Sequence, residues 1–114
     1  LGGLCLNAVA AALTCIANDF GYECVFSRQI EALGKRGDVL VCFSSSGNSA
    51  NQVEAIKSAK SLGIKTVMLS GRGGGKCASI ADYALVVPSD SGARVQEIHG
   101  LVLHTIIESI EARI

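Results

Sequence analysis

Four serines lie close together in the stretch VCFSSSGNSANQ at residues 41–52. Ser44, Ser45 and Ser46 are consecutive, and Ser49 follows after a glycine and an asparagine. Small hydroxyl donors at the amino end of a helix, where backbone N–H groups and the helix dipole attract anions, are typical of phosphate binding. The alternative is a plain turn in which Ser49 caps the helix and the other serines fill the loop. Capping does not explain three adjacent serines, so the pattern alone leaves both interpretations open.

The chain has two histidines, His99 and His104, in a C-terminal segment that also contains Gln96. A histidine that titrates near neutral pH can act as a general acid or base, although a histidine on a helix is more often a packing or surface residue. On a helix the two histidines point about 140° apart, so only one can face a given site. Gln96 and His104 are about 80° apart in direction but about 12 Å apart along the axis. Both can serve one ligand only if the helix start unwinds or one residue comes from a neighbouring subunit.

Two further stretches invite a functional interpretation. Residues 71–76 read GRGGGK, but Cys77 stands where the Walker phosphate-binding pattern needs Ser or Thr, and the dinucleotide pattern also fails. We therefore interpret this stretch as a structural turn that could line a pocket. The pair Asn18 and Asp19 interrupts an apolar segment and is equally well explained as a junction between two helices.

The segments around these residues alternate between strand and helix patterns. Apolar runs predict strands at residues 4–6, 38–43, 64–69 and 83–87, the second of them a central strand covered on both faces. Helical spacing predicts helices at residues 10–17, 20–34, 49–62, 76–80 and 91–114. This alternation predicts a single α/β domain over residues 1–114, a parallel sheet with helices on both faces. Ligands of such sheets bind beyond the carboxyl ends of the strands, where Asn7, the serine stretch, the glycine stretch and residues 88–92 would meet.

Composition excludes several classes of function. The 114 residues are 49% hydrophobic, which is ample for a packed core. Ten basic and ten acidic residues balance without a basic stripe, so nucleic-acid binding is not expected. The apolar stretch at residues 4–17 contains Asn7 and Thr14 and is too short to span a membrane. Five cysteines without a C-x-x-C pair favour free thiols in a reducing cytoplasm.

The phrases ANDFG, SSSGNS, LSGRGGGK and ARVQE, in this order, resemble the sugar isomerase (SIS) domain family, and within it the phosphoheptose isomerases. The resemblance implies a flavodoxin-like sheet and conversion of sedoheptulose 7-phosphate to D-glycero-D-manno-heptose 7-phosphate, for lipopolysaccharide or surface glycan biosynthesis. It implies a homotetramer with active sites at subunit interfaces. The implied site residues are Ser44, Ser45, Ser46 and Ser49 for the phosphate, Asn18 and Asp19 for the sugar, and Gln96 and His104 for catalysis.

The implied chemistry suits these groups. Aldose–ketose isomerisation moves a proton between C1 and C2 through an enediol, so it needs an acid–base pair, and His104 is the implied catalytic histidine. Gln96 would bind the substrate or, together with His104, one zinc ion per subunit, while His99 would be a bystander. Zinc would polarise the carbonyl, but it usually takes more ligands than these two.

The sequence also departs from the family pattern. The family places its first strand, a glycine-serine loop and a helix with a histidine and the glutamate base ahead of the position of Leu1. We therefore expect residues 1–114 to form the larger, C-terminal part of the family domain and to lack the base. Residues 7–10 and Gly92 also differ from the family's usual residues. Two non-catalytic alternatives are a module that binds the replication initiator and a sugar-phosphate sensor, but the presence of His104 favours the enzyme.

Overall fold

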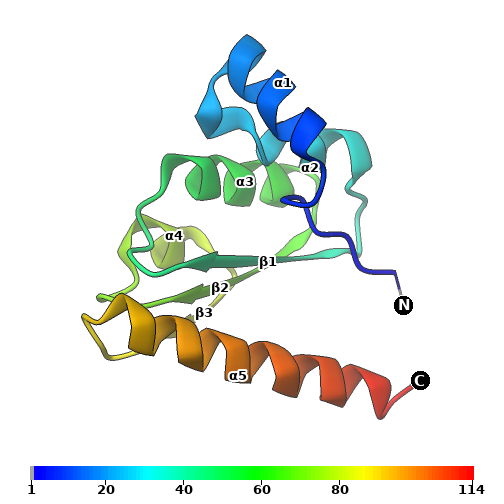
Figure 1. Ribbon diagram of the computed structural model, residues 1–114. Helices are drawn as coiled ribbons and strands as arrows, with labels where there is room; N and C mark the ends of the chain where they lie inside the picture. Colours follow the sequence, from blue (N-terminus) through cyan, green and yellow to red (C-terminus); the bar gives the residue numbers. More distant parts are fainter. Residues whose placement is uncertain (1) are drawn as a thin grey trace.

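The computed structural model describes residues 2–114, which form a parallel β-sheet with helices on both faces (Figure 1). The strands are β1 (Val39–Ser44), β2 (Lys65–Ser70) and β3 (Tyr83–Val86), in the order β1-β2-β3. Both pairings are parallel, so that Phe43, Leu69 and Leu85 lie in one row across the sheet. Because the strands run in the same direction, their carboxyl ends meet at one edge, as the sequence predicts.

Helices cover the two faces of the sheet unequally. The helical elements are α1 (Ala10–Phe20), the 3₁₀ helix η1 (Tyr22–Cys24), α2 (Ser27–Leu33), α3 (Ala50–Ser61), α4 (Gly75–Ile80) and α5 (Gly92–Glu111). Helices α3 and α4 lie on one face and α5 runs along the other, while α1 and α2 pack outside α3 (Figure 1). The predicted α/β class is confirmed. Among residues 2–114, no helix combines the length and the apolar character needed to cross a lipid bilayer.

Helix α3 holds the layers together because its residues belong to two buried clusters. Against the sheet, Ile56 of α3 packs with Met68 of β2 and with two buried thiols, Cys42 and Cys77. On its outer side α3 takes part in a second cluster, formed by Val25, Phe26, Ile30, Ala55, Ala59 and Ile64. Full burial of an aliphatic side chain contributes about 1.5–3 kcal/mol, so these contacts fix the start of α3 relative to the sheet.

The strand predicted at residues 4–6 is absent, and that prediction is wrong. The segment before α1 has a turn but no strand pairing. A strand needs neighbouring backbone groups for its N–H and C=O, whereas here the carbonyl of Leu6 accepts a hydrogen bond from the side-chain amide of Gln29 at 3.1 Å. Asn7 therefore does not follow a strand, and the basis for placing it at the carboxyl edge of the sheet is lost.

Helix α1 extends beyond its predicted end. It continues through Asn18 and Asp19 to Phe20 and stops at Gly21, whose φ of 93° ends the helix. The side-chain amide of Asn18 donates to the carboxylate of Asp19 at 2.8 Å, so neither side chain competes for the helix backbone. The junction between helices is therefore Gly21, and η1 and α2 replace the single helix predicted over residues 20–34.

Strand β1 differs from the predicted central strand. Within the described residues β2 is central and β1 lies at the edge of the sheet. Val39 and Phe43, which point toward the face of α5, are 60% and 40% exposed because α5 packs mainly against β2. A continuous apolar run fits an edge strand with one partly open face as well as a buried central strand, so the pattern could not separate the two.

Candidate functional site

Three loops meet at the carboxyl ends of the strands. The serine loop (45–49) joins β1 to α3, the glycine loop (71–74) joins β2 to α4, and a third loop (87–91) joins β3 to α5. The amide of Cys77 donates to the carbonyl of Gly47 at 2.8 Å, which ties α4 to the serine loop. The amide of Arg72 in the glycine loop donates to the carbonyl of Ser89 in the third loop at 3.4 Å. The predicted meeting of these three loops is confirmed.

Hydroxyl groups converge beside the amino end of α3. The oxygen atoms of Ser44 and Ser49 lie 3.4 Å apart, within hydrogen-bonding distance. Ser44 Oγ also accepts from the amide of Gly47 at 3.1 Å, and Ser46 Oγ accepts from the amide of Asn48 at 3.3 Å. Because Ser46 Oγ uses a lone pair for the loop, its hydroxyl hydrogen stays available for an outside acceptor. Such an arrangement suits an anion that accepts several short hydrogen bonds.

Ser49 stands at the N-cap position of α3 without capping it. Its backbone is extended, with φ of −64° and ψ of 125°, but its hydroxyl makes no bond to the first turn. The amides of Ala50 and Asn51 make none of the described hydrogen bonds, that of Gln52 donates to the carbonyl of Ser49 at 3.1 Å, and the first turn of α3 carries no acidic side chain. The interpretation of Ser49 as a mere cap is therefore not supported, and the geometry favours an anion at this helix end.

The glycine loop packs backbone to backbone against the serine loop. A β-carbon on Gly47 would collide with the carbonyl oxygen of Gly74, and one on Gly75 would lie 2.7 Å from the carbonyl oxygen of Ser46. Gly47 has a φ of 65° and Gly75 a φ of 59°, which an L side chain rarely adopts. The glycines are therefore needed for close approach and for backbone conformation, which agrees with their interpretation as a structural turn.

A shallow pocket of about 340 Å³ lies beside Ser49. Its walls are Tyr22 and Glu23 of η1 together with Ser49, Ala50 and Asn51 at the start of α3. The carboxylate of Glu23 folds back toward Gly21, where a β-carbon would lie 2.7 Å from Oε2. The sequence interpretation missed Tyr22 and Glu23 because it placed them in a long helix. Gly21, a helix-stopping residue, was the signal that could have exposed a turn there.

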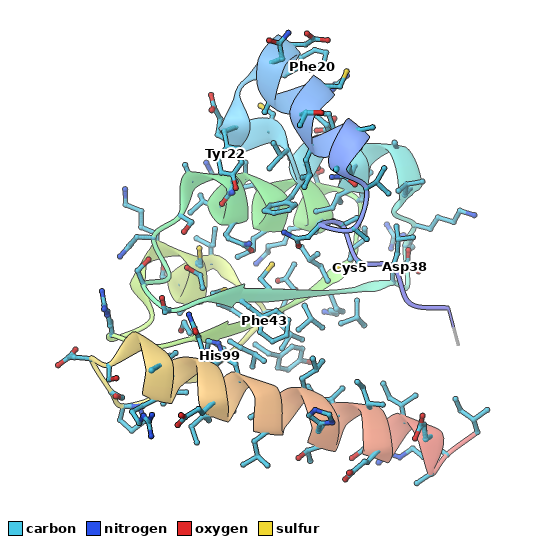
Figure 2. The ribbon with its side chains drawn as sticks, viewed as in Figure 1. Cys5, Phe20, Tyr22, Asp38, Phe43 and His99 are labelled. Atoms are coloured by element: carbon cyan, nitrogen blue, oxygen red, sulfur yellow. The ribbon has the colours of Figure 1, made fainter. Side chains whose placement is uncertain are left out.

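Asn18 and Asp19 are exposed in the last turn of α1. The thiol of Cys15, one turn earlier, lies 3.6 Å from Oδ2 of Asp19, so the carboxylate is held by its own helix. None of the described hydrogen bonds joins the pair to the serine loop. In Figure 2 the end of α1, marked by Phe20, lies on the opposite side of the molecule from His99. Their role in sugar binding stays a prediction.

Helix α5 brings a different set of side chains toward the same edge. Val95 is fully buried and occupies the space in which a β-carbon on Gly71 would lie. His99 is 5% exposed, and its ring centroid lies 5.9 Å from that of Phe43 at a tilt of 60° (Figure 2). Gln96 and His104 are exposed. As their spacing predicts, the two histidines face different surroundings: His99 packs inside the domain and His104 is open to a ligand.

The donor groups for the expected zinc ion are incomplete within one chain. Gln96 and His104 lie on the unbroken helix α5, where a separation of eight residues corresponds to about 12 Å along the axis. Residues 2–114 contain no cluster of three His, Cys, Asp or Glu side chains that could bind a metal ion. Zinc prefers four ligands at about 2 Å, so Gln96 and His104 of the same chain do not form a zinc site by themselves.

Two buried thiols, Cys42 and Cys77, lie in the core between the sheet and α3. Burial raises the pKa of Cys42 to about 12, and the neighbouring Cys77 adds to the increase. Burial also raises the pKa of Cys77. Both thiols are protonated at neutral pH and act as apolar core residues, as expected for free cysteines. Cys5 and Cys15 are free as well, but they are exposed.

The sheet and its loops define a class of protein: parallel α/β domains whose candidate site lies in the loops at the carboxyl edge of the sheet. The chain belongs to the SIS domain family, whose family model matches residues 1–71. It is 52% identical over 111 residues to a phosphoheptose isomerase of Helicobacter pylori, strain HPAG1, and covers 58% of that relative. It is 50% identical to a phosphoheptose isomerase of Campylobacter jejuni, of which it covers 60%.

Solved structures give the same relationship. The phosphoheptose isomerase of Neisseria gonorrhoeae superimposes with a TM-score of 0.92 at 45% identity, over 94% of this chain and 61% of that one. The phosphoheptose isomerase of Francisella tularensis superimposes with a TM-score of 0.91 at 34% identity, over 94% of this chain and 60% of that one. The fold is therefore the SIS fold, and the chain spans about three fifths of the length of the proteins it resembles.

Proposed function

We propose that the protein carrying this chain is an aldose–ketose isomerase that converts sedoheptulose 7-phosphate to D-glycero-D-manno-heptose 7-phosphate, for lipopolysaccharide or surface glycan biosynthesis. One observation carries the proposal: the hydroxyls of Ser44 and Ser49 meet at the start of α3, where Ser49 leaves the helix uncapped. The relatives named phosphoheptose isomerase support a heptose phosphate as the molecule whose phosphate binds there.

The proposal gives each predicted residue a task. Its phosphate-binding residues are Ser44, Ser45, Ser46 and Ser49. Asn18 and Asp19 contact the hydroxyl groups of the sugar, and Gln96 orients its reacting end. His104, which is exposed, carries a proton to or from the substrate while the carbonyl group moves from C2 to C1.

A homotetramer with active sites between subunits is part of the proposal. The exposed sugar-binding and catalytic residues are spread over α1 and α5, which one chain does not bring together. Exposed apolar side chains on α5 support a subunit contact, since Leu101 is 63% exposed and Ile107 is 43% exposed. The proposal includes a zinc ion, which would polarise the substrate carbonyl. Such an ion would need further ligands besides Gln96 and His104 of one chain. The five free cysteines support a reducing cytoplasm as its location.

The test uses the intact protein with sedoheptulose 7-phosphate and follows formation of the aldose. We expect turnover, and we expect His104→Gln to reduce kcat by about 10²–10⁴-fold, the usual contribution of a general acid or base. Glu108→Gln, an exposed change on the same helix, is the matched control and should leave turnover intact. A folded wild-type protein that binds phosphate but does not isomerise the sugar would identify a binding or sensing module instead.

A further inference from the structure

Asn48 connects the serine loop to α4 through its side chain. Its Nδ2 donates to the carbonyl of Ser46 at 3.1 Å, and its Oδ1 accepts from the amide of Lys76 at 3.0 Å. Its backbone amide donates to Ser46 Oγ at 3.3 Å. Asn48 thus holds both the carbonyl and the hydroxyl of Ser46 and anchors them to the first turn of the next helix.

These bonds also decide which amides remain for an anion. The amides of Lys76 and Cys77 in the first turn of α4 donate to Asn48 Oδ1 and to the carbonyl of Gly47. They are therefore engaged by the serine loop and orient it, while none of the described hydrogen bonds uses the amides of Ala50 and Asn51 at the start of α3. The bond from Nδ2 also ties down the Ser46 carbonyl, whose negative end would otherwise be free to turn toward a bound phosphate.

We propose that Asn48 is a positioning residue for the phosphate cradle, which is formed by Ser44, Ser46, Ser49 and the start of α3. It contributes no bond to the phosphate. Its side chain binds the Ser46 carbonyl and ties it to α4, and this fixes the part of the loop that presents the Ser46 hydroxyl. This role rests on the proposed phosphate-binding function of the serine loop, and it predicts that loss of the Asn48 side chain weakens binding of the phosphate group rather than the chemistry.

The test compares Asn48→Ala with wild type in the intact protein, with inorganic phosphate as the probe and backbone amide NMR shifts of residues 44–49 as the signal. Asn48 is exposed, so the substitution leaves no cavity. We expect the Kd for phosphate to rise about 10-fold, which corresponds to about 1.4 kcal/mol. In the intact protein the KM for the sugar phosphate should rise by a similar factor while kcat stays within about 2-fold, the pattern of lost uniform binding.

Thr66→Val is the control for a general loss of stability. Thr66 is fully buried at the other end of β2 and bonds Asp82, so this change destabilises the sheet without touching the loops. Weaker phosphate binding in Asn48→Ala but not in Thr66→Val supports the proposal. Equal weakening in both variants, or unchanged binding in Asn48→Ala, overturns it while the phosphate-binding function stands. If the wild-type protein does not bind phosphate, the proposed phosphate-binding site is wrong, and so is the positioning role of Asn48.

Discussion

Replacing Gly47 with alanine should destabilise the domain by separating the serine and glycine loops. The φ of 65° at this position costs an alanine about 1–2 kcal/mol. The new β-carbon would also collide with the carbonyl oxygen of Gly74, so the loops must move apart. That movement weakens two bonds between the serine loop and the following helix α4, Gly47 to Cys77 at 2.8 Å and Asn48 to Lys76 at 3.0 Å, each contributing about 0.5–1.5 kcal/mol. The expected loss is about 2–5 kcal/mol in the free energy of unfolding.

Gly73→Ala is the matched control. Gly73 lies in the glycine loop with a φ of 77°, and no atom lies within 4 Å of the position that its β-carbon would take. It should show only the backbone cost of about 1–2 kcal/mol. Urea denaturation followed by far-UV circular dichroism gives both values, with the slope m compared to confirm that the unfolding reaction is unchanged. If Gly47→Ala costs no more than Gly73→Ala, the close contact between the loops does not stabilise the fold and our reasoning about it is wrong.

Three further outcomes test other parts of the structure. Ser49→Ala should weaken phosphate binding, measured by calorimetric titration, by about 10-fold or more, since a hydrogen bond to a charged group contributes about 1.5–3 kcal/mol. Its stability in urea should stay nearly unchanged because the hydroxyl does not cap α3. A loss of binding accompanied by an equal loss of stability would contradict this. Hydrogen bonds from the amide and hydroxyl of Thr66 lower the pKa of Asp82, so its contribution to stability is present above the ordinary pKa of aspartate and is lost as pH falls through the lower folded value. Asp82→Asn should therefore be less stable than wild type near pH 6 and lose less between pH 5 and pH 3, and parallel stability curves would refute the assignment. Cys42, with its pKa raised to about 12, should resist iodoacetamide at pH 8 while exposed Cys5 reacts, and equal alkylation by peptide mass spectrometry would show that the core opens readily.

Elements with strong local signals were predictable from the sequence. The strands β1, β2 and β3 follow from short apolar runs, α3 follows from helical spacing closed by Gly63, and α5 follows from the helical spacing of its apolar residues. The strand predicted at residues 4–6 failed because a strand exists only beside a partner, and pairing is not a property of the segment itself. The end of α1 was placed too early because Asn18 and Asp19 satisfy each other.

The candidate site was predictable by residue type but not by arrangement. The serines at the end of β1 indicate a phosphate site because hydroxyls, backbone amides and a helix start come from one continuous stretch. The absence of a cap bond from Ser49 required the structure. Asn48 is tied to α4, which lies elsewhere in the sequence, so the serine stretch alone could not indicate that bond, whereas Gly21 was a local signal for the turn that carries Glu23.

Helix α5 is attached to the domain only along part of its length. Val95 and His99 are its buried residues, both in the first half, whereas Leu103 and Ile107 in the second half are 37% and 43% exposed. A substitution at Val95 or His99 therefore disturbs buried contacts directly, with the glycine loop in the first case and with Phe43 in the second. In the second half Val102, Ile106 and Ile110 are only partly buried, so the interior of the domain constrains the two halves of one continuous helix to different degrees.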